Sequence, residues 1–95
     1  LGSPYDDQSR WNSEIPPVAN QVPVVVGELG DSDCTHKFID SFMPFADNHG
    51  LNYFGWGWVT GNCADEPALI TNYNGTPSNY GVGFRDHVKA LNLRK

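Results

Sequence analysis

Positive charge is scarce in this sequence, which has 6 Lys and Arg residues against 11 Asp and Glu residues and a formal net charge of −5. Proteins that bind nucleic acids usually present a basic face to the phosphate backbone. The charge balance therefore argues against a nucleic-acid partner and is compatible with a neutral polar ligand. Long apolar runs are also lacking, since no stretch approaches the ~20 residues that a membrane-spanning helix needs. We expect no membrane partner.

Cysteine occurs only at Cys34 and Cys63. A disulfide between them and two buried, unpaired thiols are both open, because pairing cannot be deduced from a sequence. A disulfide would close a loop of about thirty residues, contribute roughly 3–4 kcal/mol and indicate secretion of the parent protein. Metal ligands at coordinating spacing are lacking as well, since His36, His49 and His87 are scattered. We expect neither a metal nor a cofactor.

The stretch that organises the chain is VPVVVGELG at residues 22–30. Consecutive β-branched residues without alternation predict a strand over residues 22–28 with both faces covered. Glu28 follows the apolar run, with glycines nearby on both sides. The C-terminal ends of parallel strands carry the chemistry in many α/β folds. Glu28 is therefore a candidate functional carboxylate, with a solvated strand-end glutamate as the alternative.

The remaining pattern indicates alternating strands and helices. Apolar residues at i, i+3 and i+4 spacings predict a helix with a core-facing aromatic stripe after the first strand. A strand, a helix and a second strand in this order predict a parallel pair. The expected elements are a loop at 4–9, one or two helical turns at 11–15 stopped by Pro16 and Pro17, the strand at 22–28, N-cap candidates Asp31, Ser32 and Asp33, a helix at 35–49, a strand at 51–59, a long loop at 60–78 and a helix at 79–93.

The second expected strand is rich in aromatic residues. Period-two alternation places Phe54, Trp56 and Trp58 on one face, while glycines on the other face leave room for a helix. Glu28 and the tryptophans then lie near the same end of a parallel pair. A carboxylate beside indole rings suits a sugar, because indole stacks on a pyranose and a carboxylate can attack or stabilise an anomeric centre. Tryptophans packed in a core are the alternative.

Three segments together resemble the C-terminal quarter of glycoside hydrolase family 5, and its bacterial cellulase-like members most. They are VPVVVGELG at residues 22–30, YFGWGW at 53–58 and ALITNYNGTPSNYGVGFRDHV at 68–88. The resemblance implies a partial TIM barrel, in which two parallel strands alternating with helices correspond to the last two strands of a (β/α)8 barrel. It also implies that the ligand is a β-glucan or cello-oligosaccharide.

By the same resemblance, Glu28 falls on the catalytic nucleophile and Trp56 on the tryptophan that supports the attacked sugar. Trp58 would extend that platform, and Tyr5 would match an aromatic residue that hydrogen-bonds near the nucleophile. Retaining hydrolysis also needs an acid/base carboxyl about 5 Å away. The family carries it on an earlier strand that this chain lacks. Whether the chain is an enzyme by itself is therefore uncertain.

The sequence thus predicts a retaining β-glucan hydrolase represented by its C-terminal part and weakly active or inactive alone. A non-catalytic carbohydrate-binding module and an engineered barrel fragment are the alternatives. Residues 1–3 read as a tag remnant, and residues 4–95 as a single (βα)2 fragment. An isolated parallel pair has two unpaired edges, so we expect completion by self-association or by a missing N-terminal barrel portion.

Overall fold

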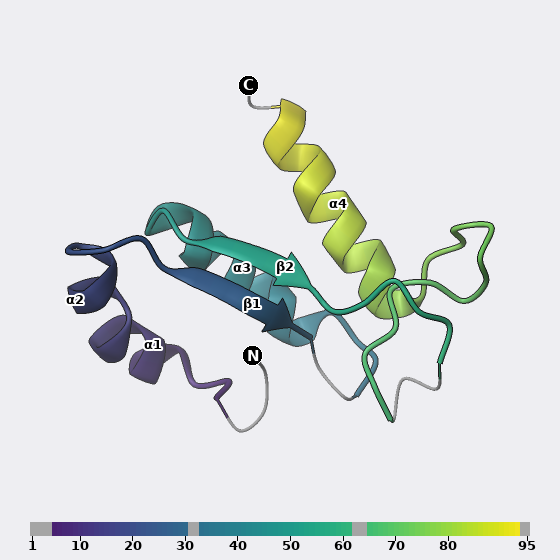
Figure 1. Ribbon diagram of the computed structural model, residues 1–95, viewed down its shortest axis with the longest axis horizontal. Coiled ribbons are helices and arrows are strands. Elements are labelled where there is room, and N and C mark those ends of the chain that lie inside the picture. The colour runs from purple at the N-terminus through teal and green to yellow at the C-terminus, as the bar shows by residue number, and fades with distance from the viewer. Residues whose placement is uncertain (1–4, 31–32, 62–64, 94–95) are drawn as a thin grey trace.

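The computed structural model describes residues 5–30, 33–61 and 65–93. Strands β1 and β2 pair in parallel, which confirms a small α/β fold in which helices and parallel strands alternate (Figure 1). Both strands are shorter than expected. The first begins three residues later than the expected range 22–28 and ends one residue later, and the second ends four residues before the expected end at 59. The elements are, in order, α1 (Gln8–Glu14), α2 (Pro16–Ala19), β1 (Val25–Leu29), α3 (Lys37–Asn48), β2 (Asn52–Gly55) and α4 (Asn79–Leu93).

The N-terminal segment is more helical than the sequence indicated. Helix α1 begins within the expected loop, where the Asp7 carboxylate accepts a hydrogen bond from the Ser9 backbone N–H at 2.9 Å and caps the helix. Pro16 and Pro17 end α1 but also occupy the first turn of α2. The expected stop is confirmed, but α2 was not expected; it can start at the two prolines because proline is well accommodated where the backbone N–H has no helical partner.

Strand β1 contains an irregularity just before its end. Val26 pairs with Tyr53 and Leu29 pairs with Gly55, so three steps along β1 match two along β2. Two residues, Gly27 and Glu28, therefore stand opposite one residue of β2, as in a β-bulge. Val26 and Leu29 are buried, whereas the two residues between them are exposed.

The two faces of the sheet differ in cover. Helix α3 lies behind the sheet in Figure 1, and no described element lies in front of it. On the open face Val25 is 56% exposed and Phe54 is 61% exposed. The expectation that both faces of β1 are covered was wrong for the described chain, which supplies helices to one face only.

Helix α3 supplies most of the core, as its aromatic stripe predicted. Trp11 of α1 packs edge-on against Phe38 and Phe42, with ring centroids 5.6 and 4.9 Å apart. Gly50 follows the helix in a left-handed conformation (φ 68°), the conformation expected of a C-terminal glycine. The start differs from expectation, because His36 is the N-cap and makes no side-chain capping bond. Asp33 instead accepts from the Thr35 backbone N–H at 2.9 Å, and the other two cap candidates lie outside the described residues.

Helix α4 agrees with its expected range and sits close to the rest of the molecule. A methyl group added at Gly81 would collide with the Leu69 carbonyl, and one added at Gly83 would collide with His36. At Gly55 of β2 it would lie 2.7 Å from the Phe84 ring. The glycine that faces the helix thus allows the close approach that the sequence predicted. Within the described ranges, no helix is long and apolar enough to cross a membrane.

Candidate functional site

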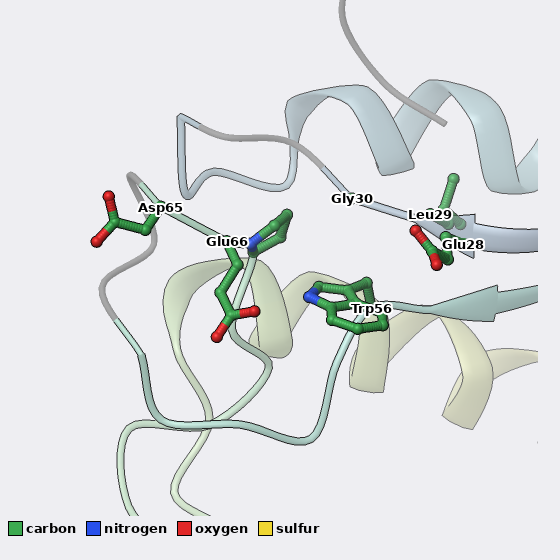
Figure 2. Close-up of a pocket in the computed structure, with 7 residues that line it drawn as sticks. Glu28, Leu29, Gly30, Trp56, Asp65 and Glu66 are labelled. Carbon is green, nitrogen blue, oxygen red and sulfur yellow. The ribbon is translucent and has the colours of Figure 1, made fainter.

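A pocket of about 190 Å³ opens where β1 and β2 end (Figure 2). It is smaller than the ~300 Å³ at the lower end of typical small-ligand sites. A small ligand, or one part of a longer ligand, is therefore a more suitable occupant than a large one. Its lining residues come from the end of β1, from the residue after β2 and from the following loop: Glu28, Leu29, Gly30, Trp56, Asp65, Glu66 and Pro67.

Glu28 reaches this pocket because of the bulge in β1. Strict alternation from the buried Val26 would place Glu28 on the covered face and Leu29 on the open face. With one extra residue in β1, Leu29 is buried instead and Glu28 is exposed. The bulge therefore decides on which side of the sheet the carboxylate lies.

Trp56 follows β2 directly and borders the same pocket. Its backbone N–H donates to the Leu29 carbonyl at 2.9 Å, which continues the strand pairing by one hydrogen bond. Trp56 is 38% exposed, so part of the residue remains available to a ligand. Glu28 and Trp56 thus meet at one opening although they come from different strands.

The loop after β2 folds back and forms one wall of the pocket, in addition to the walls that Glu28 and Trp56 provide. Gly57 donates from its backbone N–H to the Pro67 carbonyl at 3.1 Å and accepts from the Leu69 N–H at 3.0 Å. These bonds bring Asp65 and Glu66 to the pocket. Figure 2 shows the Asp65 carboxylate pointing away from the Trp56 indole. Gly30 is required opposite this wall, because a methyl group there would lie 2.8 Å from the Pro67 ring.

Tyr80, in the first turn of α4, supports the pocket from the covered side. Its fully buried hydroxyl donates to the Leu29 carbonyl at 2.7 Å. Burial raises the pKa of the Tyr80 phenol above its ordinary value, so the group remains a neutral donor. The Leu29 carbonyl therefore accepts two hydrogen bonds, one from Trp56 and one from Tyr80.

Two of the residues expected at the site lie elsewhere. Trp58 is 64% exposed and lines a separate, mainly apolar cavity with Phe84 and Arg85. Because β2 ends at Gly55, the strand alternation that would align Trp58 with Trp56 does not continue that far. The Tyr5 hydroxyl donates to Glu14 at 3.2 Å beside α1, so Tyr5 is not part of the pocket lining.

The candidate disulfide stays a prediction, because Cys63 lies outside the described residues. Its expected partner, Cys34, is half-buried on the loop between β1 and α3 and has a positive φ of 67°. Among the residues that the structure describes, no group of histidine, cysteine and carboxylate side chains has the arrangement of a metal site. Secretion of the parent protein likewise stays a prediction.

Sequence reasoning missed the roles of Glu66, Pro67 and Tyr80 at the pocket. Glu66 and Pro67 lie in the long loop expected at 60–78, and their spacing from Glu28 says nothing about how such a loop folds back. The sequence gives only a weak indication that Tyr80 supports the pocket, because an aromatic residue at the start of a core-facing helix is normally interpreted as a packing residue. Its hydrogen bond spans 51 residues of sequence, and no local pattern encodes such a contact.

Comparison of the chain with protein-family models, with curated proteins and with solved structures finds no significant match.

Proposed function

We propose that the pocket between Glu28 and Trp56 binds a β-glucan chain, and that Glu28 is the nucleophile of a retaining glycoside hydrolase of which this chain is the C-terminal part. The observation that supports the proposal is that a carboxylate and a partly exposed indole from two parallel strands line one pocket. An indole face stacks on a sugar ring, and a carboxylate beside it can form a glycosyl ester at the anomeric carbon.

Binding is the first property to test. Calorimetric titration of the chain with cellopentaose is expected to give weak binding. Trp56→Ala is expected to reduce the affinity roughly tenfold, because the stacking surface is lost. Trp58→Ala is the matched control, since it removes another exposed indole outside this pocket. Equal losses in both variants would contradict a specific role for the Glu28 pocket.

Chemistry is the second property. Retaining hydrolysis needs two carboxyl groups ~5–5.5 Å apart, so we expect the chain alone to release little or no reducing sugar from soluble β-glucan. In a longer protein that contains this segment, Glu28→Gln should abolish turnover while cellopentaose still binds. Full activity of that variant would exclude Glu28 as the nucleophile.

A carbohydrate-binding module without chemistry is the second candidate. In the view of Figure 2, the Glu28 and Glu66 carboxylates lie to either side of the Trp56 indole, and Asp65 points away from it. That arrangement favours carboxylates that accept hydrogen bonds from sugar hydroxyl groups. Binding that survives in a longer protein without any Glu28-dependent turnover would support the module.

The barrel relationship is part of the same proposal. A two-stranded sheet with one open face and exposed Val25 and Phe54 is what a segment of a larger barrel would present when separated from its neighbours. We propose that either a second copy of the chain or an N-terminal barrel portion covers this face. Sedimentation velocity is expected to detect self-association of the chain, and a stable monomer at high concentration would leave only the second arrangement.

A further inference from the structure

The hydrogen bonds around Leu29 connect three elements at the base of the pocket. The Leu29 carbonyl accepts from the Trp56 backbone N–H at 2.9 Å and from the Tyr80 hydroxyl at 2.7 Å. Leu29 is the residue at which the two strands regain their pairing after the bulge. A single backbone atom therefore joins the end of β1, the residue after β2 and the start of α4.

The bulge makes this junction important for the direction of Glu28. If the extra residue in β1 were lost by a one-residue slip, Glu28 would turn toward the covered face and Leu29 toward the pocket. Past the bulge, β1 contributes only Leu29 to the pairing before the strand ends. Backbone pairing alone therefore gives the register weak support at this point.

Helix α4 is well placed to supply the missing support. The Ser78 hydroxyl accepts from the Gly81 backbone N–H at 2.9 Å, and it also donates to the Ala68 carbonyl. Gly81 lies so close to the Leu69 carbonyl that no side chain fits between them. The first turn of α4 is thus fixed to the loop, and Tyr80 extends from a rigid base.

We propose that Tyr80 is a positioning residue, whose hydroxyl holds Leu29 in the register that directs Glu28 into the pocket beside Trp56. The inference rests on the proposed function only for the identity of the ligand. Its structural part, which is that the hydroxyl maintains the strand register, is independent of any ligand.

Tyr80→Phe is the direct test, because it removes the hydroxyl and keeps the ring. Tyr53→Phe is a matched control, since the Tyr53 hydroxyl also makes a partly buried hydrogen bond, 2.9 Å from Asp47, at a position away from the pocket. In that control Asp47 keeps its 2.7 Å contact with the His87 ring. Both variants lose one hydroxyl, and only one of them loses a bond to Leu29.

Amide hydrogen exchange at Trp56 is the readout, measured by NMR and compared with the global stability of each variant. Tyr80→Phe should accelerate Trp56 exchange roughly three- to tenfold beyond the change that its loss of global stability produces. Tyr53→Phe should cause no such excess. Equal behaviour of the two variants would overturn the proposal, because Tyr80 would then contribute stability alone.

A second readout needs no substitution. In the unsubstituted protein the Tyr80 hydroxyl proton should exchange slowly enough for NMR detection and show a nuclear Overhauser contact with the Trp56 amide proton. A rapidly exchanging Tyr80 hydroxyl would overturn the proposal even if the phenylalanine variant failed to fold.

A cellopentaose titration of the same variants separates this inference from the proposed function. If the unsubstituted chain binds the sugar, Tyr80→Phe should weaken binding several-fold and Tyr53→Phe should not. If the unsubstituted chain does not bind, the proposed function fails, while the excess exchange at Trp56 still supports the register role of Tyr80. Unchanged affinity in a Tyr80→Phe variant with fast Trp56 exchange would contradict the link between register and the pocket.

Discussion

The two faces of the β1–β2 sheet differ in burial. The covered face buries Leu29 and Val26 against α3 and α4, and it contains the hydrophobic core. The open face exposes Val25 and Phe54, and the candidate pocket opens at its end. The described chain therefore stabilises its fold on one side of the sheet, while the other side leaves apolar residues exposed beside the pocket.

Substitutions on the two faces should have very different effects on stability. Replacing the fully buried Phe42 by alanine should lower the free energy of unfolding by about 3–5 kcal/mol. The matched change Phe54→Ala on the open face should cost less than about 1 kcal/mol in the monomer. Urea denaturation of both variants at low protein concentration provides the comparison. Comparable losses would mean that the open face is covered in solution.

Glycines on the two faces offer a second comparison with a smaller effect. Gly55→Ala should destabilise the protein by about 1–3 kcal/mol, because the added methyl group meets the Phe84 ring. Gly27→Ala should change stability by no more than about 0.5 kcal/mol, since no atom lies within 4 Å of the methyl position. Thermal denaturation distinguishes the two, and a costly Gly27→Ala would indicate an additional neighbour on the open face.

Alkaline pH should weaken the covered face in particular. Burial raises the pKa of both tyrosines that hydrogen-bond behind the sheet, and at Tyr53 the bond to Asp47 adds to the effect. Because the folded protein favours the neutral phenols, their contribution is fully present below the ordinary pKa of 10.0 and is lost as pH rises above it.

The measurement is the free energy of unfolding between about pH 9 and pH 11, a range that brackets the ordinary tyrosine pKa. Tyr53→Phe and Tyr80→Phe should each reduce the alkaline loss, and the double variant should reduce it most. An unchanged pH dependence in the double variant would show that other groups cause the loss.

Local patterns were sufficient for α3, for α4 and for the strand order, but not for the start of α1 or for α2. The aromatic stripe of α3, the range of α4 and the parallel pairing all follow from hydrophobic period and element order. The prediction that both faces of β1 are covered was wrong. Consecutive valines indicate a strand that suits burial on both sides, but they do not show whether the described chain provides a second layer of helices. The helix N-cap at Asp7 could not be predicted from the sequence either, because many aspartates lie in loops without capping a helix.

Only part of the candidate site could be predicted from the sequence. Glu28 and Trp56 could be paired because both stand at the C-terminal ends of adjacent strands. The bulge that turns Glu28 outward depends on contacts of Leu29 with residues distant in sequence, and so does the wall formed by Glu66 and Pro67. Trp58 was misplaced because period-two reasoning was extended beyond the true end of β2.

Sugar binding between Glu28 and Trp56 can be tested by an NMR titration with cellopentaose. The signals to assign are the indole N–H groups of Trp56 and Trp58 and the carboxylate carbon of Glu28. We expect saturable shifts at Trp56 and Glu28, with a much smaller change at Trp58. Shifts confined to Trp58, or no shift at Trp56 and Glu28 at the highest soluble sugar concentration, would contradict it.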